Sequence, residues 1–200
     1  MKVRSFFPST ALIIFCFCQS HTQGSTNGPP SSFGAATTAQ HLSVDDFTKI
    51  ANASGDDAPL MPELAKASPH WTNAAVTIAM KYSNGKVFNE QVAATSRSIK
   101  GRYIVTTGES QFYHQKMTSI STFDEKASVY LTWSLFGSVV TEQTTAYDFD
   151  KKIYATSASY GDGFTEIDVG SYSDVADTSK VFVYKNRDLF MTREVTVTPQ

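Results

Sequence analysis

Turn signals recur about every ten residues from Trp71 to the C-terminus, and the runs between them alternate apolar and polar residues. Asn84-Gly85, the strongest short hairpin signal, separates the first two runs. In the first run every second residue is apolar: Ala74, Val76, Ile78, Met80 and Tyr82. A period of two is typical of a strand with one buried face, so this part of the chain is predicted to be a series of strands.

The remaining turn signals give the predicted topology. They lie at Lys100-Gly101 and in the segments "FDEKAS", "LFGS", "YDFDKK", "YGDGF" and "YKNRD", with no helical pattern between them. Strands that follow one another through short turns form an antiparallel meander, and closure into a barrel removes its edge strands. The predicted fold is all-β: an antiparallel meander closed into a barrel of about eight to ten strands, preceded by one or two short helices.

The N-terminal part divides into three predicted segments. Residues 1–22 combine Lys2 and Arg4 with the apolar run "FFPSTALIIFCFC", which is typical of a signal peptide. Residues 23–41 are small and polar, which favours a disordered linker. Residues 42–68 contain "LSVDDFTKIANAS" and "PELAKA", two patterns that favour short helices. The barrel domain is expected over residues 69–199.

Export is the localisation that this N-terminus predicts, either to a periplasm or to the extracellular space. The apolar run is shorter than the ~20 residues that span a bilayer, so no transmembrane segment is expected once the signal is removed. Cys16 and Cys18 each follow a phenylalanine, which disfavours lipoprotein anchoring. Both cysteines lie in the signal, so the mature chain is expected to contain no disulfide.

Composition argues against several classes of function. The chain has 17 basic and 19 acidic residues, without the basic surplus of a nucleic-acid-binding protein. No two histidines stand at metal-ligand spacing, and the acidic stretch "YGDGFTEIDVGSYSDVADTS" does not follow a calcium-loop pattern. We therefore expect no nucleic-acid partner, no metal and no cofactor. Oligomeric state is left open.

Four segments carry a family resemblance: "ELAKASPHW", "KGRYIV", "FDEKASVYLTW" and "YKNRDLFMTREV". Over residues 59–198 the chain resembles a group of secreted bacterial domains of unknown function with a lipocalin-like, calycin-type barrel. Pro69-His70 replaces the glycine that usually precedes the first tryptophan of such barrels. The resemblance implies a closed barrel with a small apolar ligand, and it implies no catalytic residue.

The leading functional hypothesis is non-enzymatic binding of a small apolar or amphipathic molecule in a barrel cavity. Aromatic side chains line such cavities, and an arginine fixes the polar end of a ligand. The residues selected as ligand-binding are Trp71, Arg102, Trp133 and Tyr184.

Two other hypotheses remain open. A small enzyme with a cone-shaped α+β barrel, of the isomerase or hydrolase kind, requires a buried acid–histidine pair such as Asp148 or Glu109 beside His114. A structural or partner-binding barrel requires no ligand at all, because its aromatic side chains fill the interior. No catalytic residue is assigned.

Overall fold

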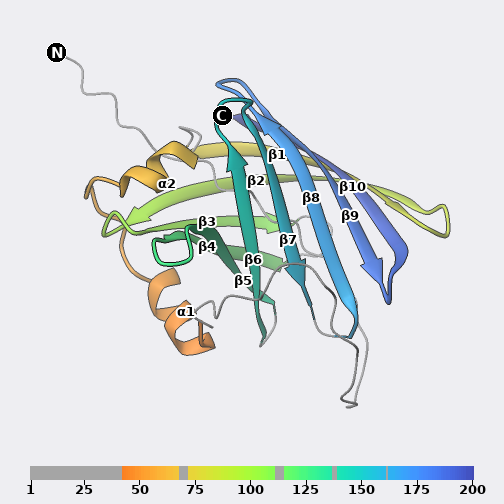
Figure 1. Ribbon diagram of the computed structural model, residues 1–200, viewed down its shortest axis with the longest axis horizontal. Helices are drawn as coiled ribbons and strands as arrows, with labels where there is room; N and C mark the ends of the chain where they lie inside the picture. The colour runs from red at the N-terminus through yellow and green to blue at the C-terminus, as the bar shows by residue number, and fades with distance from the viewer. Residues whose placement is uncertain (1–41, 68–71, 111–114, 137–138, 161) are drawn as a thin grey trace.

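The computed structural model describes residues 42–67, 72–110, 115–136, 139–160 and 162–200. The predicted signal peptide and linker, residues 1–22 and 23–41, lie outside these ranges, as does Trp71. The described elements, shown in Figure 1, are α1 (Val44–Ala51), α2 (Pro62–Ala67), β1 (Asn73–Tyr82), β2 (Val87–Ile99), β3 (Tyr103–Ser110), β4 (Gln115–Asp124), β5 (Val129–Phe136), β6 (Val139–Asp148), β7 (Ile153–Ser159), β8 (Phe164–Tyr172), β9 (Asp177–Lys185) and β10 (Asp188–Pro199).

The ten strands form one closed antiparallel meander. Each strand pairs with its neighbours in the sequence, and β1 pairs with β10 to close the barrel. The closing register runs from Ala74 opposite Pro199 to Tyr82 opposite Met191. The predicted fold class is therefore confirmed, including the two short helices before the first strand.

The predicted bend at Lys100-Gly101 lies in the three-residue connection between β2 and β3, residues 100–102. Lys100 and Gly101 have φ angles of 53° and 64°, and the Arg102 amide donates to the Ile99 carbonyl at 3.1 Å. Positive φ at both central positions is the pattern of a type I′ hairpin turn. A Cβ on Gly101 would lie 2.1 Å from the Pro59 carbonyl oxygen, so glycine also lets the segment before α2 pack against this turn.

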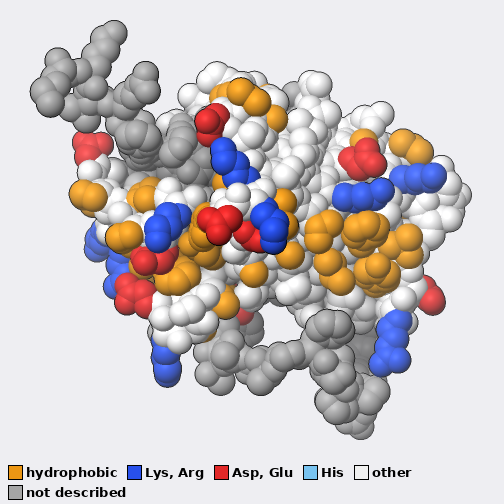
Figure 2. All heavy atoms as spheres, turned by 45° about the horizontal axis from the view of Figure 1, so that its top comes forward, with side chains coloured by type: hydrophobic (Ala, Val, Ile, Leu, Met, Phe, Trp, Pro, Cys, Tyr) orange, Lys and Arg blue, Asp and Glu red, His pale blue; other side chains and the backbone are white. Residues whose placement is uncertain are grey.

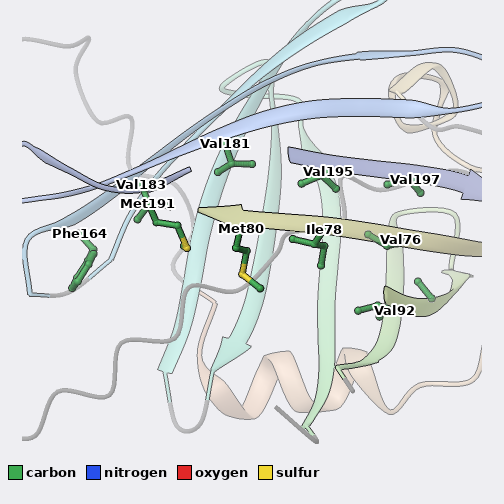
Figure 3. Packing of buried hydrophobic residues seen from close by; sticks show 11 residues of the cluster. Val76, Ile78, Met80, Val92, Phe164, Val181, Val183, Met191, Val195 and Val197 are labelled. Atoms are coloured by element: carbon green, nitrogen blue, oxygen red, sulfur yellow. The ribbon is translucent and has the colours of Figure 1, made fainter. Parts of the chain in front are cut away.

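The inner face of the barrel follows from the alternation in each strand. On β1, Val76, Ile78 and Met80 are at most 2% exposed, whereas Thr77 and Lys81, which point to the other side of the sheet, are exposed. The inward side chains of β1, β2, β9 and β10 form an apolar wall together with Phe164 of β8 (Figure 3). Its buried members are Val76, Ile78, Met80, Val92, Ala94, Phe164, Val181, Val183, Met191, Val195 and Val197.

A second apolar cluster lies on the outer face, where α1 covers β4 to β6. Ser43 caps this helix by accepting a hydrogen bond from the Asp46 amide at 3.1 Å. Phe47 of α1 is 1% exposed and packs on the outer cluster, which contains Ile99, Val105, Ile120, Leu131 and Trp133. Because α1 covers this part of the sheet, β5 is buried on both faces. Its polar residues Thr132 and Ser134 face the interior.

Candidate functional site

The residues selected from the sequence do not meet in one pocket. Arg102 lies in the β2–β3 turn with an exposed side chain. Trp133 is buried in the outer cluster below α1, where its Nε1 donates to Glu142 at 2.9 Å. Tyr184 on β9 alternates with the inward Val183, so it points outward and is half-buried. These three side chains are therefore outside the barrel interior, and Trp71 lies outside the described residues.

The acids named in the enzyme hypothesis are both at the surface. Asp148 forms an exposed ion pair with Lys151 at 2.8 Å, and this hydrogen bond lowers the pKa of the carboxyl group. Glu109 on β3 is exposed as well. His114 lies outside the described residues. The structure thus gives neither acid the burial that an acid–histidine pair requires.

Polar residues instead gather on the inner face of the barrel, opposite to and beside the apolar wall. Arg193 on β10 is fully buried, and its Nη2 donates to the Oε2 of Glu166 on β8, which is 4% exposed. Tyr160, after β7, donates from its hydroxyl to the same Glu166 oxygen at 3.1 Å. Gln143 on β6 donates from Nε2 to the Tyr160 hydroxyl at 3.0 Å. A continuous hydrogen-bonded chain thus crosses the interior from β6 to β10.

Asp168 lies beside this chain on the inner face of β8, two residues after Glu166. Burial raises the pKa of its carboxyl group to about 6, and the negative charge of Glu166 adds to the increase. A hydrogen bond from Ser179 and the charge of Arg193 act in the opposite direction. The Oδ1 atom of Asp168 has no hydrogen-bonding partner among the described residues. Asp168 is therefore an acid that changes charge in a physiological pH range.

Several other buried polar atoms of the interior also have no partner within the part of the chain that the structure describes. Gln143 is 1% exposed, and its Oε1 is one of these atoms. The hydroxyl oxygens of Ser98, Ser119 and Ser134 are further examples on this face. A buried polar atom without a hydrogen bond costs about 1–3 kcal/mol, and native interiors contain few of them. Such atoms mark places where a polar molecule gains hydrogen bonds on entering.

Tyrosine rings occupy the end of the barrel nearest α2. Tyr147 contacts Tyr130, Tyr154 and Tyr172, with ring centroids 4.8, 5.8 and 6.0 Å away. The hydroxyl of Tyr130 donates to the Glu63 carbonyl of α2 at 3.0 Å, which ties the helix to the rings. Burial raises the pKa values of all four tyrosine hydroxyls, that of Tyr130 to about 12. These phenols therefore stay neutral at physiological pH.

A groove of about 910 Å³ lies over β6 to β10, lined by Ala146, Tyr147, Asp148, Ile153, Tyr154, Ala155, Val169, Gly170, Ser171, Thr178, Ser179, Lys180, Glu194, Val195 and Thr196. Most of its side chains belong to the exposed set that alternates with the inward one, so the groove is on the outer face. Ile153 and Val169 in it are 42% and 45% exposed. Figure 2 shows hydrophobic patches bordered by Lys and Arg side chains on one face of the molecule.

No protein-family model matches this sequence, and no curated protein matches it either. Within the described ranges, no three His, Cys, Asp or Glu side chains are grouped as a metal site requires. None of the described helices has the length and hydropathy needed to cross a membrane.

The buried charged residues of the interior could in part have been found from the sequence. Arg193 stands at a position where Met191, Val195 and Val197 share its face, so a charged residue interrupts an apolar alternation. On β8 the relation is reversed, because the alternating apolar residues Ile167 and Val169 are exposed and the acids Glu166 and Asp168 face inward. A charged residue that interrupts an apolar strand face is a candidate for a buried functional group. Arg102, which was selected as an arginine that could fix the polar end of a ligand, does not interrupt such a face.

Proposed function

We propose that this protein binds a small amphipathic molecule in the interior of its barrel, without catalysing a reaction. The observation that carries the proposal is the division of the interior into two surfaces. One is the apolar wall of β1, β2, β9 and β10, and the other is the polar chain from Gln143 to Arg193. A mostly apolar surface with a few convergent polar groups is the usual composition of a small-molecule site.

The polar groups would fix the orientation of the ligand, and the apolar wall would supply most of the binding free energy. Burial of apolar surface contributes about 25 cal/mol per Å². Hydrogen bonds to the buried Gln143 and Asp168 oxygens would add specificity, because a ligand that leaves these atoms unpaired binds less tightly.

Export belongs to the same proposal. It is supported by the basic start and apolar run within residues 1–22 and by the resemblance to secreted bacterial barrel domains over residues 59–198. An exported barrel of this kind would carry its ligand in an environment outside the cytoplasm. The segment that supports export lies outside the described residues.

Native mass spectrometry of protein purified without denaturation tests the binding proposal. We expect an adduct of a few hundred daltons that is lost on unfolding. Ala158→Phe places a ring on the inner face between Gln143 and Glu166, so it should abolish the adduct. Ala155→Phe is the matched control, because Ala155 is on the same strand but faces outward into the groove.

The outcomes distinguish a ligand in the interior from a ligand in the outer groove and from a barrel without a ligand. Loss of the adduct in Ala158→Phe alone supports binding in the interior. Loss in Ala155→Phe alone places the ligand in the outer groove and contradicts the proposal. Circular dichroism shows whether Ala158→Phe is folded, and Ala94→Phe provides a second substitution on the inner face. A protein that carries no adduct and takes up no decanol, decanoate or decylammonium when these are supplied would favour the purely structural barrel.

A further inference from the structure

Charged and neutral polar side chains occupy different strands of the barrel interior. The charged side chains at inward positions lie on β2, β8, β9 and β10, and they are Glu90, Glu166, Asp168, Asp177 and Arg193. The buried polar side chains of β4 to β7 are all uncharged within the described residues, and they are Ser119, Ser121, Thr132, Ser134, Gln143, Thr145 and Thr156. These seven residues form a neutral polar surface.

Ser119 and Ser134 face each other on this neutral polar surface, and neither hydroxyl has a hydrogen-bonding partner among the described residues. They are 4% and 1% exposed. The Cβ atoms of such opposing residues lie about 4.5–5.5 Å apart, which is close enough for two hydroxyls to bond. Two residues further along the same strands, Ser121 and Thr132 do bond to each other, at 2.8 Å. The Ser119 and Ser134 hydroxyls are therefore left to bond to another molecule.

Gln143 adds a third group on the next strand, β6, where it is the register partner of Thr132. It is 1% exposed, and its Nε2 donates to the Tyr160 hydroxyl at 3.0 Å. Its Oε1 has no partner in the described part of the chain. Ser119, Ser134 and Gln143 thus lie on three adjacent strands, and neighbouring strands are about 4.8 Å apart. A ligand that bonds to all three needs polar groups spread over about 10 Å.

The chemistry of these three side chains selects the polar part of the ligand. A serine hydroxyl both donates and accepts, whereas the amide oxygen of Gln143 only accepts. A ligand hydroxyl also donates and accepts, so it matches each of them. A charged head on the neutral polar surface would be buried with no opposite charge beside it, which is unfavourable. The surface therefore favours an uncharged head group with more than one hydroxyl.

We infer that the ligand of the barrel is a neutral polyol amphiphile. Its hydroxyls bond to Ser119, Ser134 and Gln143, and its apolar part lies along the wall of β1, β2, β9 and β10. This inference rests on the proposed function and specifies its ligand class. It differs from the expectation from the sequence, in which an arginine fixes the polar end of the ligand.

Isothermal titration calorimetry of the full chain at pH 7.5 tests the inference with four probes that share a ten-carbon chain. They are the glycerol monoether decylglycerol, decanol, decanoate and decylammonium. We expect decylglycerol to bind about tenfold more tightly than decanol, because it forms additional hydrogen bonds, and both charged probes to bind less tightly than decanol.

Two results overturn the polyol inference and leave binding in the interior intact. One is decylglycerol that binds no more tightly than decanol, and the other is a charged probe that binds as tightly as decylglycerol. Failure of all four probes to bind overturns the proposed function as well.

Substitutions locate the polyol head. The double variant Ser119→Ala with Ser134→Ala should bind decylglycerol at least about fivefold less tightly, because it removes two hydrogen-bonding groups. Decanol binding should stay unchanged, since its one hydroxyl can still bond to Gln143. Ser157→Ala with Ser159→Ala is the matched control, because both serines are exposed on the outer face of β7.

Urea denaturation without added probe separates a role in binding from a role in folding. The Ser119→Ala, Ser134→Ala protein should be at least as stable as the native protein, because neither hydroxyl has a partner in the described part of the chain. An unchanged decylglycerol affinity in this folded variant contradicts the assignment of the head group to these serines.

Discussion

Arg193 and Glu166 are the residues on which the interior depends most. The arginine is fully buried on β10, and its partner on β8 is 4% exposed, so the pair links two strands that are not neighbours. Two charges in an apolar interior are tolerated only as a pair. The pair also aligns Tyr160 and Gln143, because both are hydrogen-bonded in series to the Glu166 carboxylate.

Breaking this pair should cost far more stability than replacing it. We expect Glu166→Gln to lower the free energy of unfolding by about 3–5 kcal/mol, since it leaves the Arg193 charge buried without its counter-ion. The double variant Glu166→Leu with Arg193→Met should lose clearly less, because neither charge of the pair remains buried without its partner. Urea denaturation measures both. Equal losses in the single and double variants would show that the ion pair is not the dominant interaction.

Asp168 should make stability depend on pH. Its folded-state pKa of about 6 exceeds the usual value of 3.8, so the folded protein holds this proton more tightly than the unfolded chain does. The associated stabilisation is fully present below the usual value and is lost as pH rises through the folded-state value. The Asp168→Asn variant has no ionisable group at this position, so it does not lose this stabilisation as the pH rises. We expect the variant to gain up to about 3 kcal/mol over the native protein between pH 4 and 7.5.

Urea denaturation of both proteins at several pH values checks this. Glu166, Arg193 and Ser179 are the neighbours that modify the titration, and they are the same in both proteins. Asp148→Asn should show the opposite trend, because the pKa of Asp148 is lowered and its contribution is lost as pH falls. A stability difference between Asp168→Asn and the native protein that is constant across this pH range contradicts the account.

At the scale of elements, α1 covers the outer face of β5 and allows that face to be apolar. Leu131 and Trp133 of β5 face outward and are covered by the helix, while Thr132 and Ser134 face the interior. The helix is held at its C-terminal end by Arg97 of β2, whose Nη2 donates to the Ala51 carbonyl and whose Nε donates to Ala53 at 3.3 Å. The helix therefore takes the place that solvent would have on this part of the sheet.

Phe47→Ala should detach α1 and expose the outer cluster. Truncation of a buried phenylalanine costs about 3–5 kcal/mol, and here the loss falls on one helix and the sheet beneath it. In a Trp71→Phe background, Trp133 is the one tryptophan left, and its fluorescence should shift to the red. Val44→Ala is the control, because Val44 on the same helix is 40% exposed. Unchanged emission in Phe47→Ala would mean that this phenylalanine does not hold the helix in place.

At the scale of the whole molecule, the meander could be predicted from patterns of neighbouring residues. The candidate site could not, because it depends on contacts between strands that are far apart in the sequence. Turn signals and period-two alternation depend on neighbouring residues, so the ten strands and the Lys100-Gly101 turn were accessible from the sequence. The approach of Arg193 to Glu166 depends on register across β8, β9 and β10, which no local pattern encodes. Trp133 was expected in the interior because apolar residues usually lie there, but α1 buries it outside.

The proposed function requires that a small amphipathic molecule lie inside the barrel. Methyl-labelled isoleucine and methionine residues report this directly in an NMR spectrum of the protein with bound decanol. We expect intermolecular NOEs from the decanol chain to Ile78, Met80 and Met191 on the inner wall. We expect no NOEs to Ile153 and Ile167, which are exposed on the outer face. NOEs to the outer isoleucines alone, or to neither set, would contradict the proposed function.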